Sequence, residues 1–95
     1  MSEIFVVQGS TGEYSDHREW LIKAFVKELA AQDFVEKVSA RAREITQAEE
    51  TARDARDYSF YDRKDPKFVN ELDKDMQIDY TGVEYTYFPV ELVEE

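Results

Sequence analysis

Cysteine is absent from this sequence, and histidine occurs only once. Without cysteine there are no disulfide bridges and no cysteine-based zinc sites, so a bound metal would need oxygen ligands. The acids of the C-terminal part lack the glycine and the final glutamate of an EF-hand calcium loop. We therefore expect neither a metal nor another cofactor.

Long apolar runs are also missing. The apolar segment 4–7 is too short for a signal peptide or a membrane span, and no basic region precedes it. Proline and glycine are scarce, with two and three residues, and the sequence contains no repeat or low-complexity linker. These absences favour a cytoplasmic protein that does not contact a membrane.

Basic residues are few beside the acidic ones. The chain has 12 lysines and arginines against 22 acids, which gives a net charge of -10 and a pI near 4.5. Such a charge repels phosphate backbones and therefore disfavours direct binding of nucleic acid. At 95 residues we expect one domain, 1–95, that is too small for a deep cavity or several cofactors.

Two strands are predicted in the N-terminal part. Residues 3–8 are rich in β-branched and aromatic side chains and precede the turn-forming segment 9–12. Residues 18–26 alternate with period two, which places Trp20, Ile22 and Ala24 on one face and the residues between them on the other. We expect the two strands to pair as a hairpin with a long loop.

A long amphipathic helix is predicted to begin near Glu28, where the apolar period changes to about 3.6 residues, and to end between Arg53 and Tyr58. Beyond Ile45 its inner face carries only alanine. Because alanine buries little surface, we expect this half of the helix to project or fray.

A short second helix is predicted near 66–72. Asp65 provides an N-cap, and a proline follows at the first helical position. Phe68, Val69 and Leu72 would then face inward.

A third strand is predicted over 83–93, where aromatic and β-branched residues gather. Pro89 cannot donate a ladder hydrogen bond, so it places this strand at an edge or a bulge. The order ββαβ predicts an α+β fold, in which a three-stranded antiparallel sheet of order 2-1-3 packs against the long helix.

All three predicted strands carry apolar side chains on both faces, whereas a sheet with one solvated face alternates apolar and polar residues. The second face should therefore be covered, either by the segment 58–80 or by another chain. The second possibility includes a homodimer.

The region 9–18 contains residue types of several functional sites. Its glycines suggest a phosphate-binding loop, but no helix pattern or lysine follows, and a hairpin loop explains them better. Ser15, Asp16 and His17 are adjacent in sequence, so they cannot converge as a catalytic triad. A small-ligand site is the alternative function that we consider, with the residues Tyr14, Asp16, His17, Asp79 and Tyr80.

A partner-binding patch is predicted in the acidic C-terminal half, where aromatic rings stand beside carboxylates. Tyrosine and phenylalanine are typical of interfaces, and acids spaced along a small domain form a negative stripe that suits a basic groove. Acids that only keep the protein soluble are the competing interpretation. The predicted patch comprises Tyr58, Phe60, Tyr61, Asp62, Asp65, Asp73 and Asp75.

Two stretches, GSTGEYSDHREW at 9–20 and DYTGVEY at 79–85, resemble signature segments of small bacteriophage and prophage proteins that have no assigned activity. The resemblance implies a phage protein in the host bacterial cytosol and implies no catalytic residues. Small acidic phage proteins resemble, as a class, inhibitors of host defence such as anti-CRISPR proteins, by analogy alone.

We therefore expect a non-enzymatic phage accessory protein that binds a host or phage protein with a basic surface. Its expected effect is to inhibit a host defence or nucleic-acid-handling complex. The alternatives are a small-ligand-binding module that uses the loop 9–18, and a structural subunit of a homo-oligomer.

Overall fold

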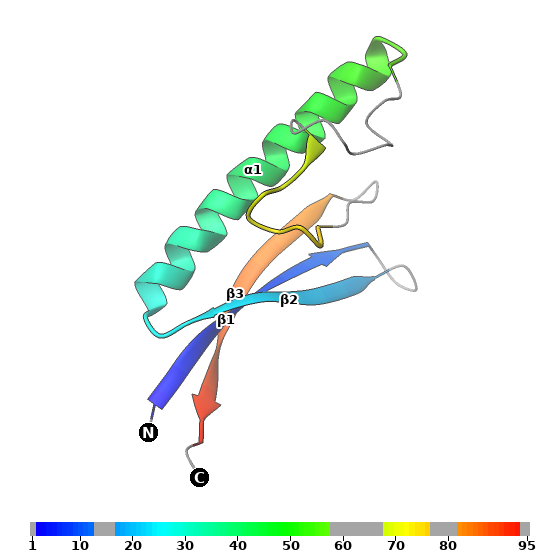
Figure 1. The fold of residues 1–95 in the computed structure, drawn as a ribbon. Coiled ribbons are helices and arrows are strands. Elements are labelled where there is room, and N and C mark those ends of the chain that lie inside the picture. The colour runs from blue at the N-terminus through cyan, green and yellow to red at the C-terminus, as the bar shows by residue number, and fades with distance from the viewer. Residues whose placement is uncertain (1, 13–16, 58–67, 77–81, 94–95) are drawn as a thin grey trace.

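The computed structural model describes residues 2–12, 17–57, 68–76 and 82–93. Its elements are β1 (Ser2–Thr11), β2 (Arg18–Phe25), α1 (Glu28–Asp54) and β3 (Val83–Leu92). β1 is the central strand and pairs antiparallel with both neighbours, in the order β2-β1-β3 (Figure 1). This confirms the predicted α+β fold with ββαβ order and one long helix.

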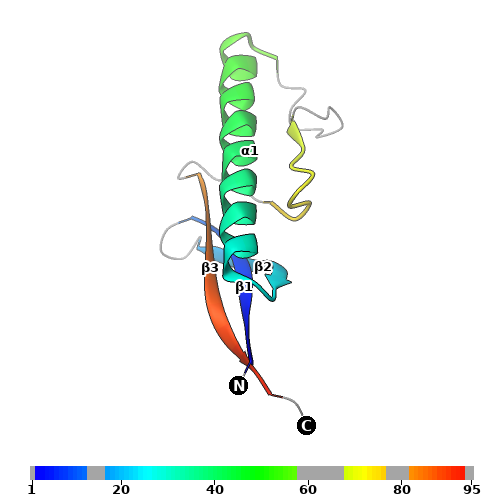
Figure 2. The same ribbon diagram turned by 90° about the vertical axis from the view of Figure 1, so that its left-hand side faces the viewer.

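α1 covers one face of the sheet, as the two ribbon views show (Figures 1 and 2). Its inward positions recur at helical spacing, and Ala31, Val38 and Ile45 are completely or almost completely buried. They pack with Val7 of β1 and Tyr85 of β3 in the main hydrophobic core. The core is therefore a single layer between the helix and the sheet.

β2 contains a bulge that changes which side chains face the helix. Val7 pairs with Lys23 and the next residue of β1 pairs with Leu21, so Ile22 is an extra residue in β2. An inserted residue moves the rest of the strand to the opposite face. As a result Ile22 and Phe25 both pack against the core, and the strict alternation predicted for 18–26 is wrong.

The short second helix predicted near 66–72 is not seen over 69–72, where residues 69 and 70 are irregular and residues 71 and 72 form a turn after a 3-10 residue at Phe68. The Asn70 side chain accepts a hydrogen bond from the Leu72 backbone N–H at 3.0 Å, and the Asn70 carbonyl accepts one from Asp73 N–H at 3.1 Å. Such local bonds compete with a helical ladder. Residues 65–67, which include the predicted cap, lie outside the described ranges.

Phe68 gives the C-terminal half of α1 an apolar partner. Its side chain is completely buried and packs against Ala48 and Ala52 in a second, smaller cluster. The expectation that this half of the helix has little to bury is therefore wrong. The helix closes with a hydrogen bond of 2.8 Å from Asp57 N–H to the Ala52 carbonyl.

Candidate functional site

Asp73, predicted from the sequence to bind a partner, is a buried residue with 4% of its surface exposed. Its Oδ2 accepts hydrogen bonds from Trp20 Nε1 at 2.8 Å and from the Tyr85 hydroxyl at 2.9 Å. Its Oδ1 accepts one from Asp75 N–H at 3.2 Å. The carboxylate joins the segment 68–76 to β2 and β3. It is therefore not accessible to a partner, and the prediction that Asp73 belongs to a partner-binding surface is wrong.

Trp20 and Tyr85 lie close around this carboxylate, and both donate a hydrogen bond to it. The indole of Trp20 lies over Gly9, where a Cβ atom would stand only 2.6 Å from Cε2 of the ring. Burial raises the pKa of the Tyr85 phenol, and the hydrogen bond to Asp73 raises it further. Tyr85 therefore remains a neutral donor, and the three side chains form a structural anchor.

The rest of the predicted patch is only partly described. Asp75 is exposed and lies two residues beyond the buried Asp73. The other five residues, Tyr58, Phe60, Tyr61, Asp62 and Asp65, lie outside the described ranges. The patch as a whole therefore stays a prediction, with Asp75 as its described surface member.

His17, from the predicted ligand-binding set, is engaged through both ring nitrogens. Nε2 lies 2.8 Å from Glu19 Oε1, and Nδ1 lies 3.2 Å from the Gly12 carbonyl oxygen. The bond to Glu19 and then the bond to Gly12 raise the pKa of the imidazole above its ordinary value. Because the side chains of His17 and Glu19 are both exposed, this pair is a solvated contact of the hairpin end.

The predicted ligand-binding loop borders a small open hollow of about 270 Å³. The Thr11 hydroxyl donates to the Gly82 carbonyl there, which brings the hairpin end and the start of β3 together. Tyr14, Asp16, Asp79 and Tyr80 lie outside the described residues, so their place relative to His17 is not tested. The hollow is lined by Ser10, Thr11, Gly12, His17, Gly82, Val83 and Glu84.

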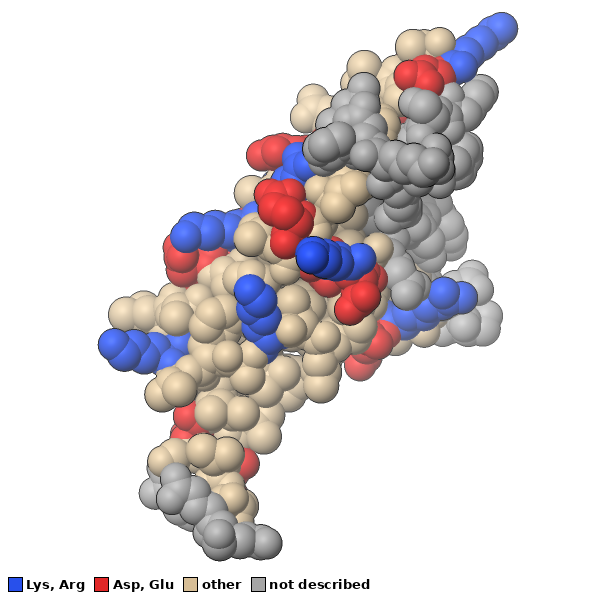
Figure 3. All heavy atoms as spheres, viewed as in Figure 1, with Lys and Arg blue, Asp and Glu red and all other residues tan. Residues whose placement is uncertain are grey.

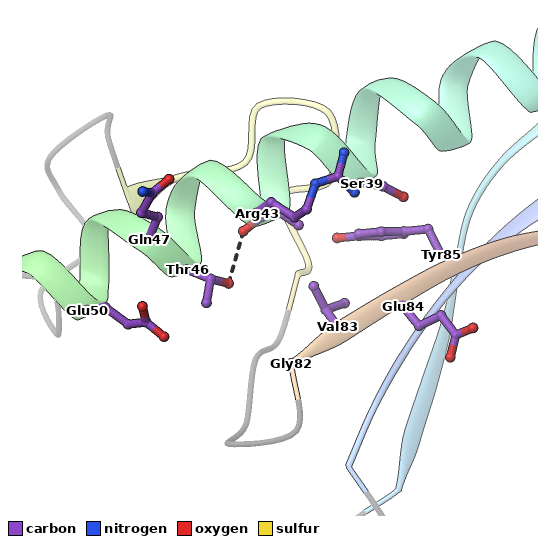
Figure 4. A pocket seen from close by; sticks show the side chains of 10 residues that line it. Ser39, Arg43, Thr46, Gln47, Glu50, Gly82, Val83, Glu84 and Tyr85 are labelled. Atoms are coloured by element: carbon purple, nitrogen blue, oxygen red, sulfur yellow. Dashed lines mark hydrogen bonds between the residues drawn. The ribbon is translucent and has the colours of Figure 1, made fainter.

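A larger open groove of about 560 Å³ runs between α1 and the start of β3 (Figure 4). Arg43 is the one basic residue in its lining, beside the acids Glu50 and Glu84. The Thr46 hydroxyl donates to the Ala42 carbonyl at 3.0 Å, and the Tyr85 hydroxyl donates to Asp73. The hydroxyls of Thr46 and Tyr85 are therefore both engaged in hydrogen bonds within the described residues.

Two bases of α1 are held in ion pairs. Lys37 lies 2.8 Å from Asp33, and Arg41 bonds Glu44 at 3.1 Å and Glu71 at 3.0 Å. The hydrogen bond to Asp33 raises the pKa of Lys37. On the face seen in Figure 3, the acidic and basic side chains of the described residues are intermixed.

The β1–β3 pair, by contrast, is purely acidic in its charges. Its two strands contain Glu3, Glu84 and Glu91 and no lysine or arginine. In the register Glu3 stands directly opposite Glu91, beyond the point where the pairing of β2 begins at Phe5. Like charges directly opposite each other are unfavourable in an antiparallel pair.

Sequence reasoning missed this glutamate pair. The absence of bases from both strands is visible in the sequence, but the facing of two particular residues depends on register. Periodicity alone leaves the register open, because it fixes only which residues share a face.

Among the described residues, no three His, Cys, Asp or Glu side chains come together in an arrangement that could hold a metal ion. No helix in these ranges is long and apolar enough to cross a membrane.

No protein-family model, curated protein or solved structure matches this chain.

Proposed function

We propose that this chain acts by binding a protein with a basic surface and not by catalysis. The observation that carries the proposal is the glutamate pair, Glu3 opposite Glu91, on two strands without a base. A lysine or arginine of a partner that reaches both carboxylates relieves their repulsion. This gain is made only on binding, so it contributes to affinity and to the choice of partner.

The wider charge distribution supports the same proposal. The described ranges contain 15 of the 22 acids and nine of the 12 bases, and Asp73 is the one buried acid among them. Lys37 and Arg41 are already held in ion pairs. The surplus of negative charge therefore faces solvent, where it accelerates encounter with a basic surface.

The partner that suits such a surface is a protein that normally binds nucleic acid. Carboxylates on an elongated body, 55 Å in its longest extent, take the place of phosphates in a basic groove. In the phage setting implied by the sequence resemblance, the chain is an accessory protein of the host cytosol. There it blocks a defence or nucleic-acid-handling complex.

A pull-down from bacterial lysate, followed by mass spectrometry, identifies the partner, and surface plasmon resonance at low and high salt then measures the interaction. We expect Glu3→Gln with Glu91→Gln to slow association and weaken binding about tenfold. The matched control is Glu49→Gln with Glu50→Gln, which makes the same change of charge on α1 and has a smaller effect. Binding that ignores both salt and the Glu3 and Glu91 variants contradicts the proposal.

The same measurement tests the predicted patch. Replacing Asp62, Asp65 and Asp75 by asparagine is expected to slow association, whereas Tyr61→Ala is expected to speed dissociation by removing an aromatic anchor. Asp73 is left unchanged because its carboxylate is part of the core. If none of these variants alters either rate, the contact lies elsewhere on the chain.

A small-ligand-binding module is the second candidate function, favoured by the hollow that joins His17 to the start of β3. It is tested by NMR with a panel of amino acids and small amines. The ligand function predicts shifts at Gly12 and Gly82 that disappear in His17→Ala and that change little with salt. An absence of shifts at these positions removes it.

A further inference from the structure

The sheet face opposite α1 carries a continuous apolar patch, here called the outer patch. In the register Val6 lies between Ala24 and Phe88, and Ile4 lies beside Val90. These side chains are far from buried, with 37% of Phe88, 38% of Val90 and 43% of Leu92 exposed. The outer patch comprises Ile4, Val6, Leu21, Ala24, Phe88, Val90 and Leu92.

The described chain leaves the outer patch open. α1 packs on the opposite face, against Val7 and Tyr85. The segment 68–76 packs on that face too, because Met76 lies in the same core and Asp73 bonds Trp20 and Tyr85. Residues 68–76, the part of the segment 58–80 that lies within the described ranges, therefore do not cover the outer patch.

The outer strands carry features that discourage pairing at the sheet edges. On β3, Pro89 removes a ladder donor, and on β2 a bulge and Lys23 interrupt a regular edge. Proline, bulges and lysine are the devices by which sheets avoid edge-to-edge association. The outer patch contains no proline or charged residue, and the polar residues that border it, Gln8 and Thr86, are uncharged and lie level with Leu21.

We propose that the outer patch is the interface of a homodimer, in which two copies stack these sheet faces across a twofold axis. The patch is neutral in a chain of net charge -10, so two copies approach each other there with the least repulsion. The acids on this face, Glu19 and Glu84, flank Ser10 at its far end. A basic partner, in contrast, would have to bury its charges against a surface without an acid, which is costly.

The size of the outer patch sets the strength of the dimer. Three strands about 4.8 Å apart, over about seven residues of about 3.3 Å rise, cover roughly 350 Å² in each copy. Two stacked copies bury roughly 700 to 900 Å², which is below the ~1,200 Å² of most stable complexes. We therefore expect a weak, reversible dimer that dissociates on dilution.

The homodimer does not depend on the proposed function, and the dimer and the partner contact should respond to salt in opposite directions. High salt screens the repulsion between two acidic copies and should strengthen the dimer, whereas it should weaken the contact with a basic partner. The Glu3 and Glu91 variants test the partner contact, and variants within the outer patch test the dimer.

Sedimentation equilibrium of the full chain, from low to several hundred micromolar and at two salt concentrations, measures the dimer. Phe88→Thr with Val90→Thr keeps residues of high strand propensity and is expected to raise the dissociation constant tenfold or more, by a rough count of lost apolar contact. Ala24→Glu places a carboxylate in the patch of each copy and should abolish association, whereas Ala24→Ser should not. Leu29→Gln, an exposed apolar position on α1, is the control outside the face and should have no effect.

The fluorescence of Trp20, which lies on the opposite face with Asp73, shows whether each variant is folded. A chain that stays monomeric at every concentration overturns the proposal. A dimer that persists in both outer-patch variants, or that weakens as salt rises, overturns it as well.

Discussion

The two faces of the sheet are made from the same three strands and are both apolar, yet only one of them is packed within the described chain. On the face under α1, Val7 is completely buried and Tyr85 is 6% exposed. On the outer face, the adjacent Val6 has a half-buried position, and its neighbour Phe88 is 37% exposed. Apolar composition therefore does not by itself say which face becomes core.

The difference lies in the specific contacts on the face under α1. There Gly9 admits the Trp20 ring, and the ring N–H reaches the buried Asp73 carboxylate. The outer face has apolar side chains but no comparable anchor among the described contacts. A substitution on the covered face should therefore lower stability, whereas the same substitution on the outer face should act on association.

The largest loss of stability is expected when the buried carboxylate of Asp73 is removed. Asp73→Ala leaves the Trp20 N–H and the Tyr85 hydroxyl without their acceptor, and we expect a loss of about 3 kcal/mol in the free energy of unfolding. Asp75→Ala, at the exposed neighbour, should change it by less than about 0.5 kcal/mol. Urea denaturation followed by circular dichroism measures both. Equal effects of the two variants would mean that the Asp73 anchor is not formed.

The second largest loss of stability is expected at Gly9, which lies against the ring of Trp20. Gly9→Ala places a methyl group in the indole ring and should lower stability by about 2 kcal/mol, whereas Ser10→Ala, on the outer side of β1, should be nearly neutral. In the background of Trp20→Leu, which removes the indole, Gly9→Ala should cost much less. Additive effects of the two substitutions would show that the side chains do not meet.

Val6 and Val7 are adjacent in β1 and lie on opposite faces of the sheet, so the same substitution at each position compares the two faces. Val7→Thr puts a hydroxyl into the core and should lower stability by about 1.5 kcal/mol. Val6→Thr should lower the stability of the monomer by less than about 0.5 kcal/mol and should weaken the homodimer. Thermal denaturation at low protein concentration gives the first comparison, and sedimentation gives the second. A reversed order of stability would show that the faces are wrongly assigned.

The smallest effect is expected at His17, on the solvated hairpin end. Its folded pKa lies above its ordinary value of 6.5, mainly because of the bond to Glu19. The contribution to stability is therefore fully present below the unfolded pKa and is lost as pH rises through the higher folded pKa. An NMR titration of the imidazole measures the shift, and Glu19→Gln should return the pKa toward 6.5. A pKa that does not respond to Glu19→Gln would exclude this pairing.

Much of the fold was predictable from the sequence because it depends on local pattern. The change of period near Glu28 marks the start of the helix, and the β-rich segments around Val6 and Tyr85 mark two of the strands. The strand order followed from general rules on short connections. The short helix near 66–72 was predicted wrongly, because the side chain of Asn70 bonds the local backbone.

The candidate site was less predictable from the sequence. The charge of a residue follows from its type alone, whereas its burial and the residue opposite it depend on the folded chain. Asp73 and Asp75 look alike in an acidic stretch, and only the positions of Trp20 and Tyr85 make one of them a core residue. The pairing of Glu3 with Glu91 depends on the register of strands that are far apart in the chain.

The sequence by itself determined the three strands and the long helix, the net charge of -10 and the presence of apolar residues on both sheet faces. These properties belong to single residues and to their spacing, so no contact is needed to establish them. The tertiary structure alone decided which face α1 covers, where the bulge at Ile22 exchanges the faces of the β2 side chains and which carboxylate is buried. The physical reason is that side chains distant in sequence meet only when the packed chain fixes register and face, and burial is a property of that packing.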